Sequence, residues 1–367
     1  MTHDLIIVGC GYVSYFYANS IVQNPKLNLI GAFDIDTDKL DLFCTQFRLQ
    51  KFDNLQDVFD TPCDLILNLT SINAHHELNC RLLKADKNVF CEKPVVTNLK
   101  ELDELNILLN KVSGSLFCAP TIKSARFVNT VKEIISKQTL GQLRHILLRY
   151  EAGLVHHKEP WKWKHNELVK FPACDEFKHG MVLEHAPYCL DLLHEFTENP
   201  QLLYSSKMNL IPDRTIVTSY AVDHMRESYQ SKDGVLCDIE VGSNVPESRV
   251  ALFTFDYGYV LIPDIRNEND PVLLSDERMS RWKRALTFRI ENIFGLFCRL
   301  FNIYATNGNL KYFRKIAEDQ VKRADSGKPV DFSLFLEEIV TAISANDEDY
   351  ITASYERLNF IHRNLLR

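Results

Sequence analysis

The first 120 residues alternate between short apolar runs and stretches in which apolar residues recur every three to four positions. The run at 5–8 leads through a glycine-containing turn into a helical pattern that ends at Asn24-Pro25. Further strands are predicted at 28–33, 64–69, 88–91 and 115–119, and helices at 74–85 and 99–112. This alternation predicts an α/β domain, residues 1–120, in which a doubly wound parallel sheet carries helices on both faces.

The pattern changes after Pro120. A helix is predicted at 127–137, a strand at 143–150 and an apolar helix at 182–196. Strands are then predicted at 215–222, 235–241, 249–255 and 259–262, with a hairpin around Asp256-Tyr257-Gly258. Residues 121–367 are therefore expected to form an α+β domain with an open, mostly antiparallel sheet and helices on one side, which binds substrate and mediates oligomerisation.

Charge and composition exclude several classes of protein. The chain has 367 residues, and its 42 Lys and Arg against 49 Asp and Glu give a net charge of −7, which argues against general nucleic-acid binding. No run reaches the ~18 apolar residues that a membrane span requires. The first residues lack the basic region of a secretion signal, and the 10 cysteines include no C-x-x-C pair. We therefore expect a cytoplasmic protein with free thiols and no metal site.

The turn after the first predicted strand contains the residues expected of a dinucleotide site. Gly9 permits a tight turn, and Gly11 allows the backbone to approach a pyrophosphate. Tyr12 and Val13 open the following helix, where free N–H groups face the phosphates. Ser14 stands where a third glycine or alanine is usual, and it is small enough for close packing between helix and strand.

Asp34 ends the second predicted strand, where its carboxylate can accept hydrogen bonds from the adenosine ribose hydroxyls. Asp36 and Asp38 follow, and the first basic residue is Lys39. Because three carboxylates would repel a 2′-phosphate, NAD is the expected cofactor and NADP is less expected. The alternative is an ordinary acidic surface loop.

Two later runs, Thr70-Ser71-Ile72-Asn73-Ala74-His75 and Glu92-Lys93-Pro94, carry a more specific resemblance. Together with Gly9-x-Gly11 and the stretch from Gly180 to Asp191, they resemble the Gfo/Idh/MocA family of nicotinamide-dependent oxidoreductases. The resemblance spans both predicted domains and weakens after about residue 210. It implies a Rossmann fold, and hydride transfer between nicotinamide and a hydroxyl-bearing carbon of a carbohydrate, a cyclitol or a nucleotide sugar.

The resemblance also implies roles for single residues in the first domain. It places Lys93 beside the nicotinamide and the reacting hydroxyl, where a fixed ammonium stabilises developing alkoxide charge. Glu92 would support the loop and the cofactor, and Pro94 is often cis in this family. Thr70 belongs to the same cofactor-binding run. His75 would lie near the nicotinamide ribose, and a role at the helix start is nearly as well supported.

The corresponding motif of the second domain departs from the family's commonest pattern, Asp-x-Gly-x-His. This chain reads Glu184-His185-Ala186-Pro187-Tyr188. We expect Lys93 and Tyr188 to carry proton transfer, with Glu184 orienting the substrate or Lys93. His185 is an alternative acid or base, and packing of Tyr188 against the sheet is the structural alternative.

Two other functions remain open on the same scaffold. The first is a glycosidase in which bound NAD transiently oxidises the sugar. The second is a regulatory protein that binds a dinucleotide without turnover, which the departures at Glu184 and Tyr188 permit.

Some segments are expected to serve other purposes. Residues 276–315 combine nine basic residues with many apolar ones, so membrane-surface contact is possible, but we favour burial against the second domain or a partner. The open sheet predicts a homodimer or a homotetramer. Lys123 is expected near the substrate, and the loop at 156–163 is expected to cover the active site.

Overall fold

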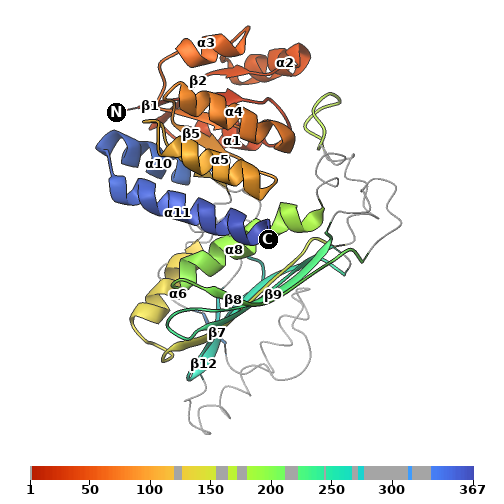
Figure 1. Ribbon diagram of the computed structural model, residues 1–367, viewed down its shortest axis with the longest axis vertical. Coiled ribbons are helices and arrows are strands. Elements are labelled where there is room, and N and C mark those ends of the chain that lie inside the picture. Colours follow the sequence, from red (N-terminus) through yellow and green to blue (C-terminus); the bar gives the residue numbers. More distant parts are fainter. Residues whose placement is uncertain are drawn as a thin grey trace.

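The computed structural model describes residues 2–119, 126–153, 164–171, 180–210, 222–243, 245–266, 272–276, 313–315 and 332–367. Two sheets organise these residues, one near each end of the view in Figure 1, and α8 (Met181–Phe196) lies between them. Several predicted features lie outside the described residues: Lys123, the loop at 156–163, most of the strand at 215–222, and residues 277–312 of the basic segment.

The first sheet is six-stranded and wholly parallel, with the order β3-β2-β1-β4-β5-β6. Its strands are β1 (His3–Val8), β2 (Leu27–Phe33), β3 (Gln50–Lys51), β4 (Leu65–Asn68), β5 (Val89–Cys91) and β6 (Leu116–Cys118). Its helices are α1 (Ser14–Ile21), α2 (Thr37–Phe47), α3 (Leu55–Asp60), α4 (Ile72–Lys84) and α5 (Leu99–Leu109). The doubly wound fold is confirmed, and the two-residue β3 is an addition to the predicted strands.

The strands of the first sheet have continuous apolar sequences because both faces of that sheet are buried. Leu5 and Ile7 on β1 enter the core on one face of the sheet, whereas Ile6 and Val8 enter the core on the other. A strand covered on both sides has no position for a polar side chain, which explains its continuous apolar sequence.

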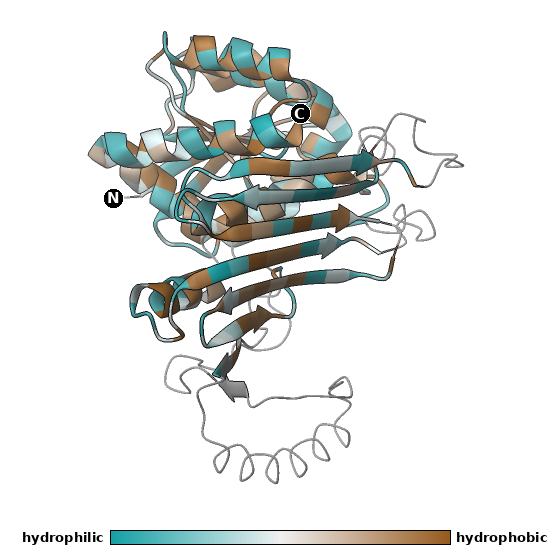
Figure 2. Cartoon of the chain, turned by 60° about the horizontal axis from the view of Figure 1, so that its bottom comes forward, coloured by the Kyte–Doolittle hydropathy of each residue, from teal (hydrophilic) through white to brown (hydrophobic). Residues whose placement is uncertain are grey.

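The second sheet is eight-stranded, with the order β14-β13-β12-β11-β7-β10-β9-β8. Among the described strands of this sheet only β10 and β7 pair in parallel, so the predicted open and mostly antiparallel sheet is confirmed. Figure 2 shows its strands side by side. The strands are β7 (Leu143–Glu151), β8 (Gln201–Met208), β9 (His224–Gln230), β10 (Leu236–Gly242), β11 (Ser248–Phe255), β12 (Gly258–Ile262), β13 (Leu273–Asp276) and β14 (Phe313–Lys315).

One face of this sheet packs against helices. α6 (Arg126–Ser136) and α8 contribute Val128, Val131 and Leu190 to a core that also holds Ile239 and Phe253 from the strands. The sequence pattern did not identify β8 and β9, because their polar residues obscure the alternation of buried and exposed positions.

The end of the chain returns to the first sheet. α10 (Ser333–Ala345) places Phe335 and Ile339 in the core that contains Leu5 and Ile7. α11 (Glu348–Leu365) packs against α8 as well as α5 and β6, and Figure 1 shows it beside both helices. Both helices fall within residues 121–367, the predicted second domain, and their contacts join that part of the chain to the first sheet.

A buried ion pair fixes α11 to α8. The Arg357 Nε atom lies 2.5 Å from Asp191 Oδ1, and Arg357 Nη1 donates to the carbonyl of Cys118 at 3.2 Å. Both side chains are almost fully buried. Since Cys118 ends β6, one guanidinium connects the first sheet, α8 and α11.

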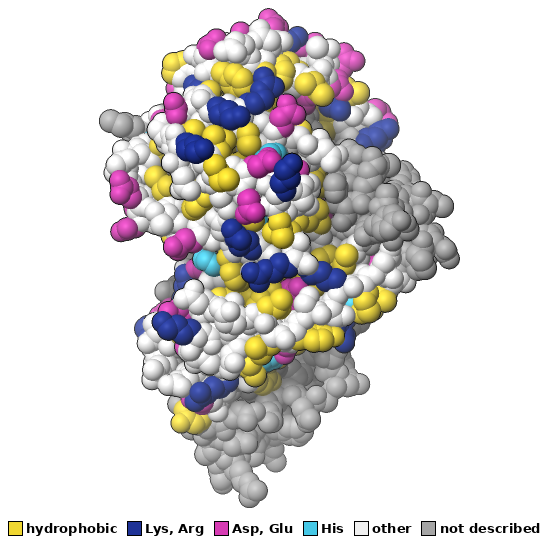
Figure 3. Space-filling model, viewed as in Figure 1, with side chains coloured by type: hydrophobic (Ala, Val, Ile, Leu, Met, Phe, Trp, Pro, Cys, Tyr) yellow, Lys and Arg dark blue, Asp and Glu magenta, His cyan; other side chains and the backbone are white. Residues whose placement is uncertain are grey.

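No described helix is long and apolar enough to cross a membrane. The cysteines in the described part of the chain are free thiols. Acidic and basic side chains are interspersed over the N-terminal domain on the face seen in Figure 3.

Candidate functional site

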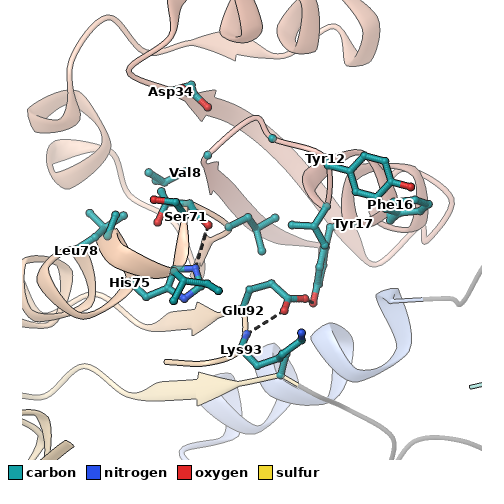
Figure 4. A pocket seen from close by; sticks show the side chains of 18 of the residues that line it. Val8, Tyr12, Phe16, Tyr17, Asp34, Ser71, His75, Leu78, Glu92 and Lys93 are labelled. Atoms are coloured by element: carbon teal, nitrogen blue, oxygen red, sulfur yellow. Dashed lines mark hydrogen bonds between the residues drawn. The ribbon is translucent and has the colours of Figure 1, made fainter. Parts of the chain in front are cut away.

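A cavity of about 1130 Å³ opens beyond the carboxyl ends of β1, β2, β4 and β5 and reaches residues of the second domain. Its lining includes the predicted residues Gly9, Gly11, Tyr12, Val13, Asp34, Thr70, His75, Glu92, Lys93, Glu184 and Tyr188. His185 is not among the lining residues. Figure 4 shows Asp34, His75, Glu92 and Lys93 arranged around the cavity.

The glycine turn at one side of the cavity uses its two glycines differently. Gly9 has φ of +99°, and a Cβ there would lie 2.6 Å from the carbonyl oxygen of Leu69. A Cβ on Gly11 would meet nothing within 4 Å. Gly9 is therefore required by the fold, whereas Gly11 leaves space that a diphosphate can occupy at the start of α1. Ser14 closes the turn by donating from Oγ to the Gly11 carbonyl at 2.6 Å.

Asp34 lies at the end of the cavity nearest α2. Its Oδ2 accepts from the Cys10 N–H at 2.6 Å, and its Oδ1 accepts from the Asp36 N–H at 2.8 Å. These bonds fix the carboxylate while leaving further lone pairs for ribose hydroxyls. Ile35 is 92% exposed and lines the cavity, so that its apolar side chain is available to an adenine ring. Together with the open space at Gly11, this geometry fits a dinucleotide.

A segment of the second domain lies against the glycine turn. His165 Nε2 donates to the Tyr12 carbonyl at 2.8 Å, and the His165 ring lies 4.7 Å from the Tyr12 ring. Phe171 meets the same tyrosine edge to face. The pattern of residues around 164–171 gave no indication of this contact, because it depends on how the two domains pack.

Glu92 and Lys93 point in different directions from the end of β5. Glu92 accepts from the Tyr17 hydroxyl at 2.6 Å and from the Lys93 N–H at 2.9 Å, so it braces the loop against α1 (Figure 4). Lys93 is 8% exposed, and its Nζ bonds both the side chain and the backbone carbonyl of Glu184 on α8. The ammonium therefore has its charge compensated by a carboxylate from the other domain.

Tyr188 lies one helical turn after Glu184. Its ring centroid is 5.5 Å from Lys93 Nζ, and it stacks on Tyr150 of β7 at 5.3 Å. Arg266 covers the Tyr188 ring at 5.2 Å and donates to the Tyr150 hydroxyl at 3.1 Å. Neither Arg266 nor Tyr150 was predicted as a site residue, because neither lies in a recognisable sequence motif.

His185 stacks on Tyr150 with ring centroids 4.7 Å apart. Burial and then the charge of Lys93 hold the pKa of its imidazole well below the usual range. Both rings therefore pack against Tyr150 of the sheet, but Tyr188 also lines the cavity whereas His185 is not among its lining residues.

Two buried histidines hold the backbone that follows Lys93. His75 Nδ1 lies 2.7 Å from the Pro94 carbonyl, and its Nε2 lies 3.0 Å from the Thr70 carbonyl. His362 on α11 accepts the Val95 N–H at Nε2 (2.9 Å), which makes its Nδ1 the protonated nitrogen, donating to the Leu358 carbonyl. The Lys93-Pro94 peptide is cis.

Comparison with known proteins agrees with this geometry. Residues 4–118 match the family model GFO_IDH_MocA, described as an oxidoreductase family with an NAD-binding Rossmann fold. The chain is 22% identical over 158 residues to glucose-6-phosphate 3-dehydrogenase of Bacillus subtilis, covering 43% of this chain and 45% of that protein. It is 27% identical over 143 residues to myo-inositol 2-dehydrogenase of Thermotoga maritima, covering 38% and 42%. The matches thus span less than half of either relative.

Solved structures resemble the chain over a greater length. A mutant 3-ketoreductase from Actinomadura kijaniata, in complex with TDP-benzene and NADP, has a TM-score of 0.69 at 10% identity and covers 99% of this chain and 96% of its own. A dehydrogenase from Bordetella pertussis, in complex with NADH and UDP-GlcNAcA, has a TM-score of 0.59 at 17% identity, covering 72% and 80%. At these identities the likeness establishes the two-domain fold.

The two glycines provide a matched test of the cofactor site. Gly11→Ala should change the free energy of unfolding by less than about 1 kcal/mol, because its Cβ enters open space, and should weaken NADH binding at least tenfold. Gly9→Ala should destabilise the fold by roughly 1–3 kcal/mol through its positive φ and its contact with Leu69. Urea unfolding and NADH fluorescence titration measure both effects. Equal NADH affinity in wild type and Gly11→Ala would contradict the assignment.

His362 should make the stability of the fold depend on pH. Burial lowers its pKa to about 4, so the unfolded chain binds a proton between pH 6.5 and 4 that the folded chain excludes. Stability is therefore lost as the pH falls, with a contribution of about 2 kcal/mol between pH 7 and pH 5. His362→Gln removes the titrating group, so urea unfolding of this variant should show a smaller loss over that interval. An unchanged loss would contradict this role.

Proposed function

We propose that the protein is an NAD(H)-dependent oxidoreductase acting on a sugar or cyclitol hydroxyl, because residues 4–118 match the model of an oxidoreductase family with an NAD-binding Rossmann fold. The observation that carries the proposal is the placement of Lys93. Its ammonium lies in the cavity that contains the glycine turn, and it is bonded to α8 beside Tyr188. The names of the two sequence relatives support a sugar-like substrate.

Gly11, the start of α1 and Asp34 would hold the dinucleotide, and the bound nicotinamide would supply the hydride acceptor or donor. Lys93 would donate a hydrogen bond to the substrate oxygen and stabilise negative charge as it develops there. Glu184 fixes the direction of the Lys93 side chain and compensates its charge. Burial of Lys93 strengthens this effect, because little water screens the charge.

We assign proton transfer to the Tyr188 hydroxyl. Its ring contacts both the ring of Tyr150 and the guanidinium of Arg266, and these contacts restrict its orientation. The positive charges of Lys93 and Arg266 lie 5.5 and 5.2 Å from the centroid of the Tyr188 ring. His185 is the weaker candidate, because it is not among the residues that line the cavity.

The substrate that fits best bears a negative charge as well as the reacting hydroxyl. Arg266 and Lys170 both line the cavity, and within the described residues no carboxylate lies within ion-pair distance of either. Lys93, in contrast, is already compensated by Glu184. A phosphate or carboxylate on the sugar would form an ion pair with these two cations.

The proposed activity is tested first through cofactor binding and then through turnover. We expect NADH to bind more tightly than NADPH in a fluorescence titration, and Asp34→Ala to weaken NADH binding. Turnover is then followed at 340 nm with hexose, hexose phosphate, nucleotide-linked hexose and inositol. Tyr188→Phe and Lys93→Met should each lower kcat by 100-fold or more without loss of NADH binding.

The outcomes separate the alternatives. Activity restricted to neutral sugars would contradict the anionic substrate but retain the oxidoreductase. Hydrolysis without net NADH formation would indicate an NAD-dependent glycosidase. If neither dinucleotide binds, the oxidoreductase proposal fails.

A second copy of the chain is the proposed partner of the open sheet face. Tyr204, Met208 and Leu236 are exposed apolar residues on that face. Association would remove them from water. Light scattering of the purified chain should give the mass of a dimer or a tetramer, and a monomer mass at micromolar concentration would contradict this.

A further inference from the structure

Three side chains that the proposed reaction does not use converge on the second sheet. Glu151 ends β7, His224 begins β9, and Glu240 lies on β10 between these strands. One ligand atom from each lies within 4.8 Å of the other two, and none of the three residues lines the cavity. Their neighbours Tyr150, Met225 and Val241 face the core under α8, so the cluster faces away from that helix.

Two atoms of the cluster are buried without a hydrogen bond. Glu151 is 1% exposed and His224 is 6% exposed. Within the described part of the chain, Glu151 Oε2 and His224 Nδ1 have no hydrogen-bond partner. An unsatisfied buried carboxylate oxygen and imidazole nitrogen are each costly, and their occurrence side by side indicates a ligand that both would bind.

Gly242 leaves the space in which such a ligand would sit. It pairs in register with Glu151 on one side and His224 on the other. A Cβ on Gly242 would lie 2.7 Å from Glu151 Oε2 and 2.8 Å from His224 Nδ1. The two unpaired atoms therefore border the position of the missing side chain. Zinc–ligand distances are about 2.0–2.2 Å, and the three candidate ligand atoms lie within 4.8 Å of one another.

The neighbouring charges define the character of the site. Glu240 Oε1 accepts from Arg226 Nη2 at 2.6 Å, and Arg149 Nε lies 3.4 Å from Glu240 Oε2. Only the contact from Arg226 is a hydrogen bond within the described residues, and carboxylates that bind metals are commonly oriented by such a bond. The two guanidinium groups lower the affinity for a cation, whereas the Glu151 carboxylate raises it. Within the described residues, Glu151 forms no ion pair with either arginine.

We propose that Glu151, His224 and Glu240 bind a divalent transition metal of the Zn²⁺ class, with water completing the coordination. One imidazole nitrogen with two carboxylate oxygens suits such a metal better than Mg²⁺ or Ca²⁺, which prefer oxygen ligands alone. The metal links β7, β10 and β9 at the end of β7. This site is independent of the proposed oxidoreductase reaction.

The test uses the full chain after treatment with a chelator and dialysis. Titration calorimetry with Zn²⁺ should give about one equivalent bound, with no comparable heat for Mg²⁺, and Zn²⁺ should raise the melting temperature. Glu151→Gln preserves size while removing a ligand charge, and should weaken Zn²⁺ binding at least tenfold. Gly242→Ala should do the same without removing any ligand, because its Cβ fills the space between the unpaired atoms.

His145→Asn is the matched control. His145 lies on the same face of the sheet, 2.8 Å from Asp238, and Asp238 also accepts from Ser228. The His145 imidazole and the Asp238 carboxylate already have hydrogen-bond partners within the chain. Replacing His145 should therefore leave Zn²⁺ binding unchanged. Circular dichroism confirms that each variant is folded. Absence of Zn²⁺ binding in wild type overturns the proposal, and so does equal binding in wild type and folded Glu151→Gln.

Discussion

The geometry of the cavity depends on the ion pair between Lys93 and Glu184. Lys93 follows the fourth predicted strand of the first domain, and Glu184 is in the first turn of α8 in the second. Burying a lysine is costly unless its charge is paired and its remaining hydrogens are bonded. The Glu184 carboxylate and backbone carbonyl together satisfy both requirements. The two domains can therefore not separate at this point without leaving the charges of Lys93 and Glu184 unpaired. The same contact keeps the Tyr188 ring near the Lys93 ammonium.

The backbone around Lys93 is held as firmly as its side chain. Bonds reach this short stretch from Tyr17 through Glu92, from His75 to Pro94, and from His362 to Val95. They come from three helices, α1, α4 and α11, and the last of these belongs to the end of the chain. Since a reacting group must be placed to within a fraction of an ångström, such support explains why the C-terminal helices return to the first sheet.

The sequence predicted those parts of the fold that local patterns determine. Continuous apolar runs located β1, β2, β4, β5 and β6, because strands buried on both faces contain few polar positions. The sequence pattern did not predict β8 and β9. These strands belong to a sheet that packs against helices on one face only, and polar residues occupy its other face. Gly9, Gly11, Asp34 and Lys93 were predictable because each has a local motif. Tyr150, His165, Arg266 and His362 were not, because their roles arise only when distant segments pack together.

The cluster of Glu151, His224 and Glu240 was likewise not predictable from the sequence. Metal sites that sequence reveals have ligands at short, regular spacing, whereas these three are brought together by strand order, in which β10 pairs with β7 on one side and β9 on the other. Register then aligns Glu151, Gly242 and His224 across the three strands. A residue without a side chain lies between two buried polar groups, so the sheet supplies both the ligand atoms and the space. This arrangement is distinct from the cavity, where charges from two domains meet, because all of its residues belong to one sheet.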